Sequence, residues 1–457
     1  MKSSISVGKP KILEIVFDLL LLLLLLVSIF RFANYLITFS NESLQMDFSA
    51  YYTAGESLNH GLSPYKNFVH NQPPIWDGIN RYKYSRFLYP PLVASFFQPL
   101  AALPYHVAKW IWGGLELAAV MATFIVAEGF FPAISYRRIL LAFSLALWYF
   151  PLLAHVERGQ IDVFTVLLIT MAIWLMVKRE RFGELSSGIL LSFAALLKLY
   201  VIFFLPFVFL QKRFRVLYGF GLGLVLILVL TVVFQGSATH LVDYVYNHLP
   251  RMANIGDIAK SNTLVNTKPI RSILEQTPPG FDTIKDGHGY LLSSLDFATD
   301  ATLVEPLWDK LTFWGMTSRA GISIGLYLIF FAAIAIWSNR YLPGGLSTVE
   351  EYLYWQIPVV VTLLVSPVTW TMNMVWLLPL FSVCIYLFSS KQTTSKKISV
   401  AIIFIALIIS ALPDIINAPF LSFAGFMFGQ YKYLYSEFLA LIGLLLFLGK
   451  KRISTVS

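Results

Sequence analysis

Long apolar runs recur along most of the chain, and short clusters of basic residues separate them. A helix that crosses a bilayer needs about 20 predominantly apolar residues, and many of these runs reach that length. Of 457 residues, 57% are hydrophobic and only 13% are charged, whereas a soluble protein of this size carries about a quarter charged residues. The sequence therefore predicts an all-α protein that crosses the membrane many times.

The first apolar run, Leu19–Leu26, lies in a longer apolar segment that follows Lys9 and Lys11. A cleaved signal peptide would have a shorter apolar core and a small-residue cleavage site soon after it. Nothing of that kind follows, so we expect a retained first span.

The basic clusters orient the spans, because cytoplasmic helix ends are rich in Lys and Arg. Eighteen of the 34 basic residues lie in such clusters: Lys2, Lys9, Lys11, Arg137, Arg138, Lys178, Arg179, Arg181, Lys212, Arg213, Arg215, Arg340, Lys391, Lys396, Lys397, Lys450, Lys451 and Arg452. The net charge of +9 is thus a consequence of topology, and no nucleic-acid partner is expected.

Apolar runs and basic clusters together predict these spans: 13–38, 107–130, 138–155, 161–177, 216–235, 320–338, 352–367, 370–388, 398–413 and 433–449. The segment 185–211 has basic residues at both ends, so it is expected to enter and leave on one side as a hairpin around Lys198. The segment 88–103 is short and rich in proline, and it is expected to lie along the outer interface or only to dip into the membrane. With these two segments, the bundle has about 10–12 membrane helices.

This topology places several polar segments on one external side. They are 39–105, the 155–160 turn, Lys198, 236–318 and the 367–370 turn. We interpret the chain, 1–457, as a single membrane domain. In it, 39–105 is a catalytic external loop with interfacial helices, and 236–318 is a long external cap loop.

Several of these segments carry recognisable motifs: Asp47-x3-Tyr51-Tyr52-x-Ala54-x3-Leu58-x2-Gly61-x2-Pro64-Tyr65, Tyr89-Pro90-Pro91-Leu92, Pro99-Leu100, Leu103-Pro104, Gly159-Gln160, Ala194-Ala195-Leu196-Leu197-Lys198, Asn262-Thr263, Arg271 and Ser366-Pro367-Val368-Thr369-Trp370. Together these motifs resemble glycosyltransferase family 87, a family of GT-C-fold enzymes, and they occur in family order over roughly residues 45–380.

The resemblance implies a GT-C-type helical bundle in a bacterial plasma membrane. Such an enzyme moves a hexose, by family default mannose, from a polyprenyl-phosphate donor to a glycolipid or polysaccharide acceptor on the extracytoplasmic face. It also implies inversion at the sugar, with Asp47 of the first external loop as the base. No cofactor is expected.

A base at Asp47 agrees with the chemistry. The acceptor hydroxyl must lose its proton as it attacks the anomeric carbon, and one positioned carboxylate can take that proton. The alternative is that Asp47 only caps the helix that begins near Phe48. Many GT-C enzymes have an acidic pair at this place, but residue 46 is Met, so no metal is expected.

The leaving phosphate gains negative charge and needs cations. Arg158 is one candidate, with Gln160 for a sugar hydroxyl; a solvated turn that also includes His155 and Glu157 is the alternative. Lys198 is another, because a cation inside an apolar stretch is costly unless it faces a cavity or partner. Snorkelling of its stem is the rival explanation.

The remaining candidates for substrate binding are less specific. They are Tyr51, Tyr52, Tyr65, Tyr89, Asn262, Lys268, Arg271, Trp370 and Asn373. Lys268 and Arg271 can equally be ordinary surface charge. Where the family often has histidines after the Trp370 motif, this chain has Asn373, which leaves the sugar open. Glu116 is expected to be a buried partner in helix packing, with a place on a proton path as the alternative.

Two other classes of function are open. A transporter or flippase for lipid-linked saccharides would line a path to both faces with polar residues, whereas here the uncommon polar groups collect on one side. A membrane scaffold would need no clustered Asp, Lys and Arg.

Overall fold

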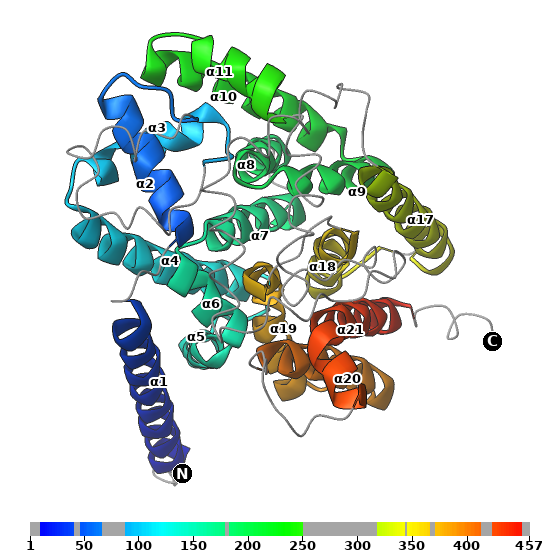
Figure 1. Cartoon of the computed structure of the whole chain (residues 1–457). Helices are drawn as coiled ribbons and strands as arrows, with labels where there is room; N and C mark the ends of the chain where they lie inside the picture. The colour runs from blue at the N-terminus through cyan, green and yellow to red at the C-terminus, as the bar shows by residue number, and fades with distance from the viewer. Residues whose placement is uncertain are drawn as a thin grey trace, which may run out of the picture.

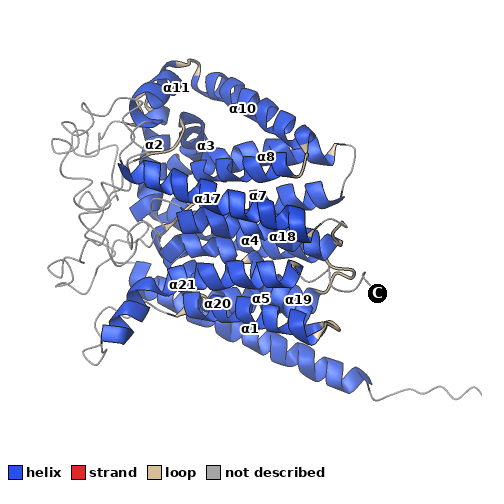
Figure 2. Cartoon of the chain, turned by 90° about the vertical axis from the view of Figure 1, so that its right-hand side faces the viewer, coloured by secondary structure: helices blue, strands red, loops and turns tan. Residues whose placement is uncertain are grey.

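The computed structural model describes residues 10–40, 46–65, 87–178, 182–249, 318–342, 345–365, 371–412 and 423–449. Within these ranges every regular element is a helix, and the longer helices lie side by side (Figure 2). An all-α polytopic membrane protein is therefore confirmed as the fold class.

The helices follow the expected apolar runs closely. The first part of the chain contains α1 (Pro10–Ser40), α2 (Met46–Asn59), α3 (Pro91–Ala101), α4 (Tyr105–Glu128), α5 (Tyr136–Trp148), α6 (Phe150–Arg158), α7 (Asp162–Lys178), α8 (Gly183–Leu197), the 3-10 helix η2 (Leu199–Phe204), α9 (Leu205–Leu210), α10 (Phe214–Gln235), α11 (Thr239–Asp243) and the π-helix η3 (Tyr244–His248). The second part contains α17 (Ser318–Tyr341), α18 (Thr348–Val365), the 3-10 helix η6 (Thr371–Leu377), α19 (Pro379–Ser389), α20 (Thr394–Ala411) and α21 (Phe423–Leu448).

In the described part of the chain, four helices are long and apolar enough to cross a bilayer: α1, α4, α10 and α20. The number rises to six if each of two bent pairs, α5 with α6 and η6 with α19, is one span. The expected total of about 10–12 membrane helices stays a prediction.

The α5–α6 pair departs from a straight 138–155 span, because the two helices meet at 71°. Pro151 near the start of α6 has no N–H, so it cannot bond the carbonyl of Leu147 one turn earlier. Arg31 of α1 donates from Nη1 to that carbonyl oxygen at 3.2 Å, and its guanidinium lies 4.4 Å from the ring centroid of Trp148. A side chain from another helix thus satisfies the carbonyl at the bend, as the bilayer interior requires.

The expected hairpin around Lys198 is present. The α8 helix ends at Leu197, and η2 and α9 then bring the chain back, so that Nη1 of Arg213 lies 3.1 Å from Oε1 of Glu184 at the start of α8. Two glycines let α10 pack directly on α8: a Cβ on Gly188 would collide with the carbonyl of Val216, and one on Gly219 would collide with that of Leu185. Lys198, which directly follows the end of α8, therefore lies at the apex of this hairpin.

Two short helices, α2 and α3, pack against each other beside the bundle (Figure 1). The α3 helix has 11 residues. Its length of roughly 16 Å is about half the hydrocarbon thickness of a bilayer, so it is too short to span. The separate core here includes Phe48, Phe97 and Trp112. This core positions the first turn of α2 against the main bundle.

Candidate active site

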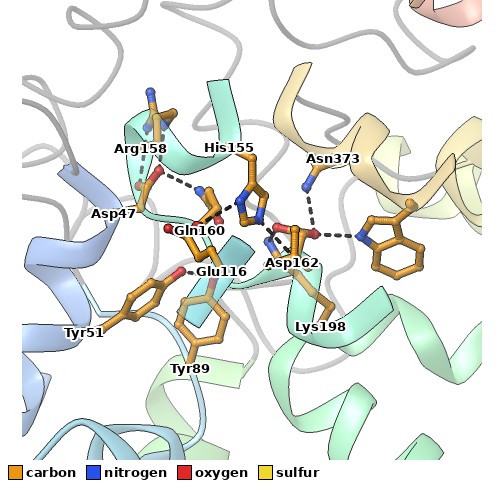
Figure 3. Close-up of polar contacts among 12 residues, drawn as sticks. Asp47, Tyr51, Tyr89, Glu116, His155, Arg158, Gln160, Asp162, Lys198 and Asn373 are labelled. Atoms are coloured by element: carbon orange, nitrogen blue, oxygen red, sulfur yellow. Dashed lines mark hydrogen bonds and ion pairs between the residues drawn. The ribbon is translucent and has the colours of Figure 1, made fainter. Parts of the chain in front are cut away.

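The polar side chains of four segments meet in one cluster (Figure 3). The segments are the first turn of α2, the turn between α6 and α7, the break between α8 and η2, and η6. Two buried ion pairs organise the cluster, one around Asp47 and one around Lys198.

Asp47 is held by two side chains from the α6–α7 turn. Its Oδ2 accepts hydrogen bonds from Nε of Arg158 and Nε2 of Gln160, each at 2.6 Å, and its Oδ1 lies 3.4 Å from Nη2 of Arg158. The side chains of Asp47 and Arg158 are only 13% and 12% exposed. The carboxylate therefore makes tertiary contacts beyond its own helix, which a capping role alone does not require.

The α6–α7 turn aims both donors at Asp47. Gly159 ends α6 with φ of 67°, a left-handed conformation that glycine adopts without strain. Its carbonyl accepts a hydrogen bond from Nε1 of Trp112 at 3.0 Å, and the N–H of Gln160 donates to the carbonyl of His155 at 3.2 Å. Arg158 and Gln160 are thereby presented on either side of one tight turn.

His155 also holds the α6–α7 turn in place. The ring is fully buried, its Nε2 accepts the N–H of Val163 at 3.3 Å, and its Nδ1 lies 2.9 Å from Oε1 of the equally buried Glu116. Because Nε2 is an acceptor, this geometry assigns the ring proton to Nδ1, toward Glu116. The expectation of a buried packing partner at Glu116 is thus confirmed.

Lys198 forms the second pair. Its Nζ lies 3.0 Å from Oδ2 of Asp162, the first residue of α7, and 6.0 Å from the ring centroid of Tyr89. Asp162 is fully buried, whereas the Lys198 side chain is 16% exposed. The lysine therefore has a partner inside the protein, which accounts for a cation in an apolar stretch.

The other oxygen of Asp162 is held by η6. Oδ1 accepts hydrogen bonds from Nδ2 of Asn373 at 3.1 Å and from Nε1 of Trp376 at 2.8 Å. Asn373, expected to contact substrate, thus has an acidic side chain as its partner. Asp162 and Trp376 were not among the candidates from sequence, since their partners are far away in the chain.

Tyrosines from the 39–105 region line the cluster. The hydroxyls of Tyr51 and Tyr89 lie 3.0 Å apart. Burial raises the pKa of both hydroxyls above the ordinary tyrosine value, so both stay neutral and can donate. Tyr65 donates to the carbonyl of Tyr89 at 2.9 Å, whereas Tyr52 points the other way and donates to the carbonyl of Leu103 at 2.7 Å.

Four predicted site residues, Asn262, Lys268, Arg271 and Trp370, lie outside the described residues. Their roles stay predictions. In the described ranges no three His, Cys, Asp or Glu side chains are grouped to hold a metal ion.

Comparison with known proteins adds an independent observation. The sequence model of glycosyltransferase family 87 matches residues 87–273. That range contains Tyr89, Arg158, Gln160 and Lys198, while Asp47 and Asn373 lie outside it.

One curated relative is a polyprenol-phosphate-mannose-dependent alpha-(1-2)-phosphatidylinositol pentamannoside mannosyltransferase from Mycolicibacterium smegmatis, 33% identical over 114 residues. The matched stretch is 25% of this chain and 26% of the relative, so the chain matches about a quarter of that protein's length. No solved structure gives a significant match. Over residues 87–273, the chain thus bears the sequence signature of glycosyltransferase family 87, and the resemblance that its motifs indicate is confirmed there.

Proposed function

We propose that this protein is an inverting membrane glycosyltransferase. It transfers a hexose, with mannose as the first choice, from a polyprenyl-phosphate donor to a glycolipid or polysaccharide acceptor. The family match and the name of the mycolicibacterial relative support this class of donor. The observation that carries the proposal is the Asp47 carboxylate, nearly buried, bound by Arg158 and adjoining the Lys198 cluster.

In the proposed reaction, Asp47 takes the proton of the acceptor hydroxyl as that oxygen attacks the anomeric carbon. The bond between that carbon and the phosphate oxygen breaks on the opposite side, and the polyprenyl phosphate leaves with the electron pair. The sugar configuration inverts. Because the phosphate leaves as a stable anion, no second carboxylic acid is needed to protonate it.

The leaving phosphate is the part of the reaction that gains charge, so cations near it lower the barrier. Arg158 has a planar fork of five N–H donors, which suits an oxyanion as well as the Asp47 carboxylate. Lys198 supplies a second cation from the hairpin apex, and its side chain is 16% exposed whereas that of Asp162 is fully buried. Neutral Tyr51 and Tyr89 hydroxyls can donate to sugar or phosphate oxygens.

The proposed face of the membrane follows from the two ends of α7. Asp162 begins this helix in the cluster, whereas Lys178 ends it at the side where Arg213 donates to the carbonyl of Met176 at 2.8 Å. Basic helix ends favour the cytoplasm, which supports an extracytoplasmic face for the cluster.

The test is transfer of radiolabel by the purified protein in lipid vesicles. Polyprenyl-phosphate-[14C]mannose and a glycolipid extract are supplied, and the products are separated by thin-layer chromatography. We expect label in a glycolipid, and its loss with Asp47→Asn. Glu56→Gln is the matched control: this carboxylate lies on the same helix and pairs with His60 at 3.1 Å.

Label transfer by Asp47→Asn at the wild-type rate would remove Asp47 as the base. Label that only changes leaflet would favour a flippase. Glucose- and galactose-carrying donors, tested alongside, determine which sugar is accepted.

A further inference from the structure

Asp162 is a fully buried carboxylate whose side chain is held by three donors from two other segments of the chain. Lys198 approaches Oδ2, while Asn373 and Trp376 donate to Oδ1. A buried charge is tolerated when its lone pairs are satisfied in this way. With both oxygens bound, the carboxylate cannot rotate without breaking several contacts, so it is a fixed point in the cluster.

The Asp162 carboxylate sets the position of the Lys198 ammonium. The ammonium has three N–H groups, and one direction is taken by Asp162 at 3.0 Å. The ring of Tyr89 lies 6.0 Å away, so the ammonium stands between the carboxylate and the tyrosines that border Asp47 (Figure 3). Of the two charged side chains, only Lys198 is partly exposed, and an anion entering the cluster would therefore meet the ammonium.

A lysine without such a partner would behave differently. The lysine side chain is a flexible four-carbon stem, and its ammonium is a compact charge without the rigid fork of arginine. Precise placement must therefore come from what it binds. At Lys198 that partner is Asp162, which is in turn fixed by η6 rather than by the helix that precedes the lysine.

We propose that Asp162, together with Asn373 and Trp376, is a positioning unit that fixes the ammonium of Lys198 against the donor phosphate. Asp162 itself does not touch the sugar or the reacting atoms. The inference rests on the proposed function, since it assigns the cation that this unit directs to the phosphate of a polyprenyl-phosphate donor. It also gives Asn373 a role that needs no positive charge.

The test is a double-mutant cycle with Asp162→Asn and Lys198→Gln. The KM for polyprenyl-phosphate-mannose, kcat and thermal unfolding are measured for both single variants and for the double variant. We expect Asp162→Asn to raise the donor KM by roughly tenfold, a typical value for losing one charge-assisted contact. In the Lys198→Gln background the same change should have no further effect, because Asp162 acts through the lysine.

The double variant separates the loss of positioning from the destabilisation that an unpaired buried charge causes. Each single change leaves one buried charge alone, whereas the double change removes both charges. Glu128→Gln is the matched control: its buried carboxylate, at the end of α4, pairs at 2.8 Å with Arg138 in the first turn of α5, and Gly129 beside it contacts Trp174 near the end of α7 away from the cluster. We expect this control to lower the unfolding temperature and leave the donor KM unchanged. Trp376→Phe should shift the donor KM in the same direction as Asp162→Asn, by less.

Two results would overturn the inference: an unchanged donor KM in folded Asp162→Asn, or an equal effect of that change with and without Lys198. A wild-type protein that transfers no hexose from any polyprenyl-phosphate donor would instead refute the proposed function. The two failures are thus distinguishable in one set of measurements.

Discussion

Buried ion pairs occur at both ends of α7, and what surrounds them differs. At one end Asp162 pairs with Lys198, and Asp47 with Arg158 lies nearby (Figure 3). At the other end Arg213 binds Glu184 and Glu351. The side chains of Arg158, Lys198 and Arg213 are 12%, 16% and 10% exposed, so burial does not distinguish the two ends.

The neighbours of the carboxylates do distinguish them. At the site end, Gln160, Asn373 and Trp376 add neutral donors to the acids, and tyrosine hydroxyls lie beside them. At the opposite end, Arg213 also donates to the carbonyl of Met176 and so connects the ends of α7, α8 and α18. At the candidate site the acids are thus bound by neutral donors as well as by cations, whereas Arg213 links three helix ends.

The largest expected effect is that of Asp47→Asn. The amide keeps the size of the side chain but cannot take the acceptor proton, and general-base catalysis contributes about 10²–10⁴-fold. We expect kcat to fall by that factor with little change in unfolding temperature. Single-turnover transfer of labelled hexose measures it. A loss below about tenfold would count against a base at this position.

Arg158→Gln should come next. The change removes the cation from Asp47 and from the proposed phosphate position, while Gln160 still binds the carboxylate. We expect kcat/KM for the donor to fall roughly hundredfold, in line with the loss of a charged oxyanion contact. Arg158→Lys should recover part of it, because the charge returns without the fork. Equal activities of the two variants would argue that charge at residue 158 is irrelevant.

Tyr51→Phe tests whether the tyrosine hydroxyls beside the candidate site contribute to transfer. It deletes the hydroxyl that lies 3.0 Å from that of Tyr89. One neutral hydrogen bond is worth about 0.5–1.5 kcal/mol, so kcat/KM should fall by roughly two- to tenfold. Tyr52→Phe is the control, since its hydroxyl bonds the carbonyl of Leu103. An equal loss in both variants would indicate a general packing effect.

Arg213→Gln should have no effect on transfer by correctly folded protein. It leaves Glu184 and Glu351 without their shared cation, and breaking such a buried pair costs about 3–5 kcal/mol. We expect a lower unfolding temperature in detergent and an unchanged donor KM. A changed KM with an unchanged unfolding temperature would remove the contrast between the two ends.

Many helices could be predicted from sequence, because long apolar runs in a chain of this composition favour membrane helices. The run 161–177 coincides with α7, and 216–235 coincides with α10, which is long and apolar enough to cross a bilayer. The hairpin around Lys198 also followed, since basic residues at both of its ends favour a return to the same side. The bend between α5 and α6 could not be predicted. A proline in an apolar run can be accommodated in a membrane helix, and the sequence does not show that Arg31 will bond the carbonyl that Pro151 leaves without a donor.

The candidate site was predictable in part. Asp47, Arg158 and Gln160 were all selected from sequence, and the structure brings them together. Asp162 was missed, because an acid at the start of a helix is an ordinary feature. Its relation to Asn373, 211 residues away, depends on tertiary packing. An available signal was the coincidence of one acid and one lysine at the ends of consecutive apolar segments.

The bond from Arg31 to the carbonyl of Leu147 has a consequence for the first helix. An apolar helix in lipid can spin about its own axis at little cost, because each face meets the same hydrocarbon. Most of α1 faces outward in this way. Arg31 reaches a carbonyl that Pro151 leaves without its helical donor, and Tyr35 of the same helix donates to Glu157 of α6 at 3.1 Å, so bonds to the α5–α6 bend help to fix the rotation of α1. The bend that leads to Arg158 therefore also helps to select the face that α1 turns to the lipid.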